Sequence, residues 1–403
     1  MKRLLAPLLV CCVAFAASTT ASGLADARHP QAGQTPTDPI QLGRIKLARE
    51  KLATALWNAN ADAISAAETD LRKVLGPFAG VPETAESLNK KGKKASRPSV
   101  TDYRKLSERM FKLGSGSEKA KNNQMELRDA AYLAIGLLAM AEARLPDAAA
   151  YRTQAAVELD YLISKQAAEG YFPYPASPAA PEHLQRRAAK VAKDHPDKVK
   201  DGFLYVQADG TQFDTGCAAY ALAYGYQVLK DERFLNSARK AGDWALTFSL
   251  SPNWNYNSFS VWQLAKIGGV TGERRYVDGA IRIAKLGILP GQMESGRWSD
   301  QHNAKSVYHW IMVRGLVELV RVLPADHPDR NMIRDKTKLA VQSRVDDILR
   351  HGGVNQVSAL VALTESLDVF GANSGWEAAL AEVGGISPYS AGVYARRRAA
   401  VTK

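Results

Sequence analysis

From Ile40 almost to the end of the chain, apolar residues recur with the spacing of amphipathic helices, and no segment alternates convincingly as a strand does. The helices come in pairs of one kind. The first member is apolar nearly all round, as in GCAAYALAYGYQVL, whereas the second carries one stripe, as in Phe234, Leu235, Ala238 and Ala241. A helix that is apolar on all sides must be covered on all sides. The first helix of each pair is therefore predicted to be inner and the second outer.

These pairs follow one another along most of the chain. They are predicted at Ile40–Ala59 with Asp62–Leu75, Glu126–Ala143 with Pro146–Gln166, Gly216–Leu229 with Glu232–Phe248, Ser258–Ile267 with Glu273–Leu286, Asn303–Val322 with Arg330–Arg350, and Val354–Phe370 with Ser374–Val383. A weak internal repeat of about 40 residues supports a two-helix unit. We predict an all-α fold, an (α/α) toroid of about six helical hairpins spanning residues 40–386. An open TPR- or HEAT-like solenoid is the competing fold, but the hairpins vary in length and lack a consensus.

Several segments fall outside the hairpins. Residues 22–39 are predicted to be a flexible lead, and residues 387–403 a basic C-terminal tail. An insertion at about residues 170–213 interrupts the helical pattern, and an interruption of this size is usually functional or disordered. It begins with Tyr171 and Tyr174 next to a basic segment. Two interpretations stay open here, a lid over a sugar chain and simple loop packing.

The N-terminus has the layout of a cleavable secretory signal over residues 1–21. Lys2 and Arg3 precede an apolar run that is too short to span a membrane. We therefore expect an exported protein, periplasmic or secreted, with no membrane insertion. Removal of the signal leaves Cys217 as the last cysteine, so no intrachain disulfide is expected and a hydrophobic core must stabilise the chain. We expect a monomer.

The formal net charge of +12 adds a preference for anionic partners. A merely solvated basic surface explains the charge equally well. Specific nucleic acid binding is disfavoured by export. The sequence has no HExxH, paired CxxC, EF-hand or phosphate-loop motif, so neither a metal nor a cofactor is expected.

Polar and aromatic clusters precede or open the predicted inner helices. If the hairpins close with one sense, the N-termini of these helices meet at one electropositive end of a funnel. The clusters contain Asn123, Gln124, Gln212, Asp214, Trp254, Asn255, Tyr256, Asn257, Trp298, Asp300, His302, Asn303, Lys305, Tyr308 and His309. Aromatic rings beside amides suit sugar rings, which favours substrate binding. Two alternatives remain: Asp214, Asn257 and Asp300 would be good helix N-caps, and the aromatic residues can plug the end of the barrel.

Three short motifs carry a resemblance to a known family. The segments QAAEGYFPYP, NWNYNSFSVW and NAKSVYHW, together with the toroid outline, resemble exported bacterial polysaccharide lyases of the (α/α) toroid kind, including alginate and glucuronan lyases. Those lyases carry an Asn-Asn-His-x-Tyr-Trp motif and a later Tyr-His pair. The counterparts here are Asn255, Tyr256 and Asn257 with Trp262, and then Tyr308 with His309. The first motif lacks the family's histidine, so the group expected there as neutraliser or base has no counterpart.

This resemblance implies β-elimination from a uronate-containing anionic polysaccharide. The reaction removes the proton at C5, so the site must neutralise the carboxylate and supply a base. Asn257, Asn303 and Arg297 are the expected carboxylate partners, because amides and guanidinium groups donate hydrogen bonds. Tyr308 is the first choice for base or acid and His302 the second. His309 lies deeper in the predicted helix, where a histidine is more often part of the core.

Other functions stay open at this point. Paired carboxylates can hydrolyse a glycosidic bond, and Asp214 and Asp300 open two predicted inner helices. A non-catalytic glycan-binding protein is the remaining alternative.

Overall fold

The computed structural model describes residues 61–75, 127–144, 147–175, 182–207, 210–300, 302–351, 354–384 and 387–401, together with residues 44, 47, 48 and 51. The expected signal peptide, the flexible lead and most of the helix predicted at Ile40–Ala59 lie outside these residues. So do two of the predicted binding residues, Asn123 and Gln124.

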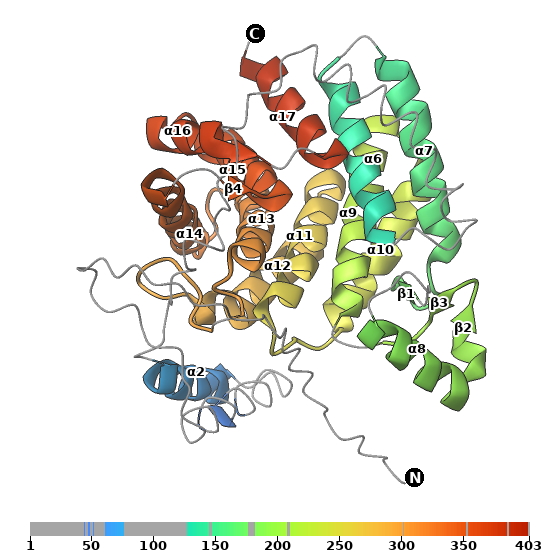
Figure 1. Cartoon of the computed structure of the whole chain (residues 1–403), viewed down its shortest axis with the longest axis horizontal. Helices are drawn as coiled ribbons and strands as arrows, with labels where there is room; N and C mark the ends of the chain where they lie inside the picture. The colour runs from blue at the N-terminus through green and yellow to red at the C-terminus, as the bar shows by residue number, and fades with distance from the viewer. Residues whose placement is uncertain are drawn as a thin grey trace, which may run out of the picture. The chain divides into compact units, whose positions relative to one another are not determined.

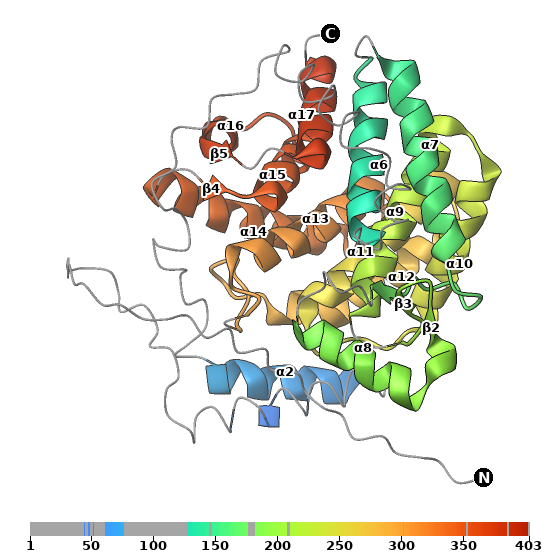
Figure 2. The ribbon, with the colours of Figure 1, turned by 45° about the vertical axis from the view of Figure 1, so that its right-hand side comes forward.

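Six inner helices form a closed ring. They are α6 (Leu127–Glu142), α9 (Thr211–Leu229), α11 (Trp254–Thr271), α13 (Ser306–Val322), α15 (Val357–Phe370) and α17 (Pro388–Val401). Each packs against the next, and α17 packs against α6. Figures 1 and 2 show this closure, with the last helix of the chain, α17 in red, beside the teal α6. The (α/α) toroid predicted from the sequence is therefore confirmed.

The outer layer consists of helices that each return along an inner helix. They are α7 (Ala148–Lys165), α10 (Glu232–Thr247), α12 (Arg274–Gly287), α14 (Arg330–His351) and α16 (Ser374–Glu382), which pack against α6, α9, α11, α13 and α15 in that order. The predicted boundaries of these helices are correct to within two residues. The N-terminal helix predicted at Asp62–Leu75 is α2 (Ala61–Leu75), which contacts the short 3₁₀ helix η2 (Leu289–Gly291).

The pattern of buried residues explains why one helix of each pair lies in the inner ring and the other in the outer layer. In α9 every residue from Thr211 to Gly225 except Phe213 is buried, so the helix must be enclosed. In α10 only one stripe is buried, which includes Phe234, Ala238 and Ala241, and the opposite face is left to solvent. The turn between α9 and α10 is marked locally, because Lys230 ends α9 in a left-handed backbone conformation (φ 62°) and the Asp231 side chain caps α10 by accepting from the Arg233 N–H at 2.9 Å.

The prediction of a basic tail over residues 387–403 was wrong, because the segment described there is α17. Tyr389, Val393 and Tyr394 are buried in the core. Two glycines let α17 approach α6, since a Cβ on Gly392 would lie 2.1 Å from the carbonyl oxygen of Gly136. The chain thus closes its ring with the segment that its charge made look like a tail.

The insertion that follows α7 contains three short strands, which form one small sheet. β1 (Tyr174–Pro175), β3 (Phe203–Leu204) and β2 (Val199–Lys200) form an antiparallel sheet in the order β1-β3-β2. Helix α8 (Glu182–Asp194) and the 3₁₀ helix η1 (Pro196–Lys198) lie between β1 and β2. A second small sheet pairs β4 (Val354–Asn355) with β5 (Val383–Gly384) in parallel.

Candidate functional site

The inner helices run in parallel, so their first turns meet at one end of the ring. This is shown by contacts in register: Asp214 near the start of α9 pairs with Arg128 of α6, Asn255 of α11 reaches Asn303 just before α13, and Ser306 of α13 donates to Gln356 just before α15. We call this end the mouth. It gathers the N-terminal ends of the helix dipoles, which favour negatively charged ligands.

Asn257, predicted to bind a substrate carboxylate, has no amide N–H left for a ligand. Its Nδ2 donates to the carbonyl oxygens of Ser251 and Gly287, at 2.8 and 2.9 Å, and its Oδ1 accepts from the Ser251 N–H at 2.8 Å. The amide lies in this position because α11 begins at Trp254, four residues earlier than expected. This start turns Asn257 toward the end of α12 and makes Asn253, not Asn257, the N-cap residue.

A second set of predicted binding residues forms a buried hydrogen-bonded cluster. Asn255 donates to Asn303 Oδ1 at 2.9 Å, and Asn303 in turn donates to Asp300 through both its backbone N–H and its side-chain amide, each at 2.9 Å. Asp300 therefore stabilises the turn before α13 and is not the N-cap of that helix, which is Lys305. All three side chains are buried. They organise the wall of the mouth.

The aromatic residues predicted to stack on sugars lie inside that wall. Trp298 is 0% exposed and its Nε1 donates to the Ile288 carbonyl at 2.9 Å. His309, also 0% exposed, makes an edge contact with Trp298 and hydrogen bonds through Nε2 to the Ala340 carbonyl at 2.9 Å. Burial, with the nearby Arg344, holds the pKa of His309 well below its usual value, so it is a neutral core histidine. Trp254 is buried against Gly291. For these residues the plug interpretation fits the structure.

Arg297 is also occupied. Its guanidinium forms a buried ion pair with Asp347, which Arg344 approaches at 3.2 Å from its own helix. Arg297 was predicted to bind a carboxylate of the substrate. The carboxylate that it binds in the structure is that of Asp347. The arginine instead ties the segment before α13 to α14.

Gln212, Asp214 and Arg128 lie at the α6 and α9 sides of the mouth. Gln212 donates to Ser260 at 3.2 Å and is buried. Asp214 is buried in the first turn of α9, whose N-cap is Gly210, and Arg128 Nε contacts it at 3.2 Å. The Arg128 guanidinium also lies over the ring of Phe213. Sequence reasoning missed Arg128, although an arginine in the first turn of an apolar inner helix was a usable signal.

Four of the predicted residues that the structure describes remain at least partly accessible at the mouth. His302 and Lys305 are exposed, and Tyr308 is half-buried in the first turn of α13. The rings of His302 and Tyr308 are stacked with centroids 4.0 Å apart. Partial burial raises the pKa of Tyr308, which favours the protonated phenol. A phenol and an imidazole are thus held in contact where solvent can reach them. Tyr256 of α11 is half-buried at the same end.

The two predicted tyrosines of the insertion, Tyr171 and Tyr174, differ in burial. Tyr171 is buried and packs on Trp244 of α10, and the next backbone N–H donates to Thr215 Oγ1 at 3.0 Å. Loop packing, not a lid, describes this residue. Tyr174 is half-buried in β1, and its hydroxyl lies close to Gly210 at the start of α9.

A layer around Arg314 fills the ring between its two ends. This buried guanidinium lies 3.8 Å from the ring centroid of Trp262 and hydrogen bonds to the hydroxyls of Tyr132 and Tyr389 at 3.4 Å. The two tyrosine rings are stacked with centroids 5.0 Å apart. An arginine inside the apolar run VYHWIMVRGLVELV was the sequence signal for this layer, which the sequence analysis did not use.

Two observations concern ligands and membranes. Within the described part of the chain, no group of three or more His, Cys, Asp or Glu side chains is arranged to hold a metal ion. Of the helices that the structure describes, none has the length and apolarity to cross a bilayer.

Comparison with known proteins gives likenesses of fold. No family model matches the chain, and no curated protein matches it. Among solved structures, it is similar to a GH76 alpha-mannanase of Bacteroides thetaiotaomicron (TM-score 0.48, 12% identity, covering 74% of this chain and 95% of that one). It is also similar to a polysaccharide lyase (0.45, 13%, 74% and 98%) and to UGL, an unsaturated glucuronyl hydrolase, with dGlcA-Glc-Rha-Glc (0.41, 13%, 60% and 65%).

Proposed function

We propose that this protein is an exported enzyme that cleaves a uronate-containing anionic polysaccharide by β-elimination at the mouth. The observation that carries the proposal is the stacked, solvent-accessible pair of His302 and Tyr308 at the N-terminal end of the inner helices. The resemblance of NAKSVYHW to toroidal lyases supports the same assignment.

The proposed chemistry divides two proton transfers between these residues. The neutral imidazole of His302 takes the proton from C5 of the uronate, the C4–O bond breaks, and a C4=C5 double bond forms. The Tyr308 phenol gives its proton to the departing glycosidic oxygen. The raised pKa of Tyr308 supports the donor role, since the phenol keeps its proton at neutral pH. This gives Tyr308 the role of acid and leaves the base to His302.

Stabilisation of the substrate carboxylate falls to the positive groups at the same end of the ring. Asn257, Asn303 and Arg297 are occupied within the protein, so Lys305 takes this role together with the N-terminal dipoles of the inner helices. Lys305 is exposed. It lies between His302 and Tyr308 in the sequence, so its charge is close to the two residues proposed for the proton transfers.

The reaction class is tested by offering the protein, without residues 1–21, a panel of alginate, glucuronan, pectate, hyaluronan and heparin-like glycans. A lyase produces an unsaturated uronate, so ultraviolet absorbance should rise together with new chain ends. New reducing ends without this absorbance would make the protein a hydrolase. Binding without either signal would make it a glycan-binding protein.

The residue assignment is tested with Tyr308→Phe, which removes only the phenolic oxygen. We expect kcat to fall by about a hundredfold or more, with substrate binding nearly unchanged, because general acid catalysis contributes on this scale. Tyr226→Phe is the matched control, a half-buried tyrosine at the far end of α9, and should keep full activity. Full activity in Tyr308→Phe would rule out the proposed acid.

A further inference from the structure

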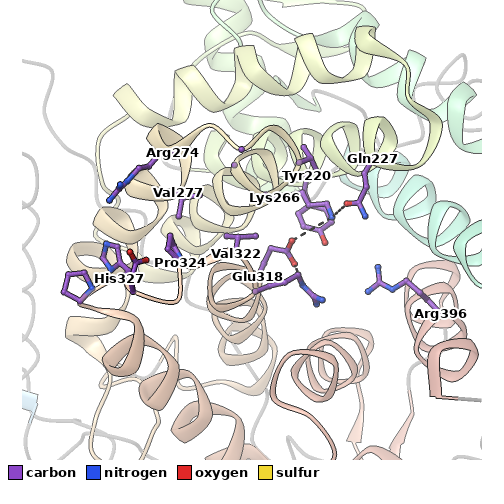
Figure 3. A pocket seen from close by; sticks show the side chains of 17 residues that line it. Tyr220, Gln227, Lys266, Arg274, Val277, Glu318, Val322, Pro324, His327 and Arg396 are labelled. Atoms are coloured by element: carbon purple, nitrogen blue, oxygen red, sulfur yellow. Dashed lines mark hydrogen bonds and ion pairs between the residues drawn. The ribbon is translucent and has the colours of Figure 1, made fainter. Parts of the chain in front are cut away.

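A cavity lies at the opposite end of the ring from the mouth. It has a volume of about 840 Å³ and is lined by residues from the C-terminal ends of α9, α11 and α13, with contributions from α12 and α17. Figure 3 shows Lys266, Glu318 and Tyr220 at its inner side and Arg396 reaching toward them from α17. The Arg314 layer separates this cavity from the mouth. We call it the far pocket.

Charged side chains of the far pocket are buried, which marks it as a built site and not a surface depression. Lys266 is 7% exposed and Glu318 2% exposed. Lys266 Nζ donates to Gln227 Oε1 at 2.6 Å and pairs with Glu318 at 3.9 Å. Buried charges are costly unless they are paired, and here they face an open cavity.

The cations of the far pocket have more hydrogen-bond donors than the protein uses. Arg321 donates to Glu318 through Nε alone, which leaves its two terminal nitrogens without a partner among the described residues. Arg396 donates to the Tyr224 hydroxyl at 3.1 Å, whereas Glu142 and Asp368 lie 3.8 Å away, beyond hydrogen-bonding distance. The carboxylate of Glu318 is already shared by Arg321 and Lys266. The donors left over face the cavity and can bind a ligand that brings acceptor oxygens.

The charge of the lining favours an anionic ligand. Lys266, Arg274, Arg321 and Arg396 outnumber the two acids of the lining, Glu318 and Asp326. Glu365 lies buried beside Arg321 and Arg396, and burial raises its pKa to about 7, so it offsets less charge than an ordinary carboxylate does. The C-terminal ends of the helices repel anions, so side chains and not helix dipoles must hold one. A planar guanidinium such as that of Arg321 suits a carboxylate in particular, because it can donate two parallel hydrogen bonds.

The rest of the wall is extended and mixes apolar residues with Arg274, Asp326 and His327. Val277, Val322, Pro324 and Pro328 line the side away from the buried charges, and the volume exceeds what a lone inorganic anion fills. A flat, partly apolar ring that carries a carboxylate matches both walls. We infer that the far pocket is a second binding site, separate from the mouth, for a small carboxylate-bearing sugar such as a free uronic acid or an acidic disaccharide. The choice of a sugar rests on the proposed function, whereas the choice of a carboxylate rests on the pocket.

The inference is tested by calorimetric titration with glucuronate, which has no glycosidic bond to cleave, so that binding is measured whether or not the protein is a lyase. Glucuronate should bind, and glucose should bind at least about tenfold more weakly, because it lacks the charge-assisted hydrogen bonds. Equal binding of both sugars would overturn the carboxylate assignment. Equal binding of sulfate and glucuronate would overturn the sugar assignment.

The position of the site is tested by substitutions. Arg321→Gln should weaken glucuronate binding about tenfold, and Arg321→Lys, which keeps the charge beside Glu318, should weaken it less. Arg274→Gln, at an exposed position of the rim, gives a smaller loss without disturbing the core. Arg282→Gln, an exposed arginine outside the pocket, is the matched control and should bind as the unaltered protein does. A loss in Lys305→Gln equal to that in Arg321→Gln would place the ligand at the mouth and overturn the inference.

Discussion

At the scale of single residues, Asn257 shows how a polar side chain at the mouth can serve the fold. Its amide joins the loop at Ser251, the end of α12 at Gly287 and its own helix α11. The backbone groups it satisfies are buried and have no access to water. If the Asn257 side chain is removed, each of these backbone groups stays buried without a hydrogen-bond partner, which costs the free energy of its desolvation.

We therefore expect Asn257→Ala to lower the free energy of unfolding by about 3 kcal/mol, since several buried hydrogen bonds are lost together. Urea denaturation measures this loss. Asn236→Ala, at an exposed position of α10, is the control and should stay within about 0.5 kcal/mol of the unaltered protein. Unchanged stability with lost glycan binding would return Asn257 to the substrate site.

The residue scale is also where sequence reasoning was weakest. Trp298, Asp300 and His302 lie within five positions and have equally suggestive chemistry, yet two are buried and His302 is exposed. The difference is the direction of each side chain. Direction depends on where a helix begins. Helix α13 begins at Ser306, three residues later than predicted, so Trp298, Asp300 and His302 lie in the segment before the helix, where helical periodicity does not fix their directions.

At the scale of elements, periodicity predicted the helices well, because enclosure on one face or on all faces leaves a clear pattern of apolar residues. Helix α17 was the exception. In the sequence alone, the run of Arg396, Arg397 and Arg398 suggests a solvated tail. In the ring, Arg397 contacts Asp368 and Glu377 at 2.9 and 2.6 Å, acids from α15 and α16. The acidic partners of Arg397 are distant in the sequence, so the charge of the run could not reveal these ion pairs.

Closure of the ring depends on the contact between α17 and α6. A Cβ on Gly392 would lie 2.1 Å from the Gly136 carbonyl oxygen, and this backbone atom cannot move away as a side chain could. We expect Gly392→Leu to lower the free energy of unfolding by about 3 kcal/mol through overpacking. Chemical denaturation measures the effect, with Ala400→Leu on the exposed face of the same helix as control. Equal stability of the two variants would mean that α17 does not need this close approach.

At the scale of the whole molecule, the Arg314 layer divides the ring into two ends of opposite helix polarity. The mouth has the helix N-termini and few buried acids apart from Asp214 and Asp300. The far pocket has the C-termini together with the buried Glu318 and Glu365, which interact with the exposed Arg321 and the half-buried Arg396. Each end therefore has its own electrostatic character, and a change of pH acts on them differently.

Glu365 sets the strongest expectation for pH. Burial, and then the neighbouring Glu318, raise its pKa to about 7, against the opposing effect of Arg321 and Arg396. A carboxyl whose pKa is higher in the folded state stabilises the fold below its unfolded pKa, and this contribution is lost as pH rises through about 7. Glu365→Gln, which stays neutral, should therefore gain about 2 kcal/mol over the unaltered protein between pH 5 and pH 8. Urea denaturation of both proteins at the two pH values measures the difference. The same difference at both pH values would mean that Glu365 ionises equally in the folded and unfolded chains.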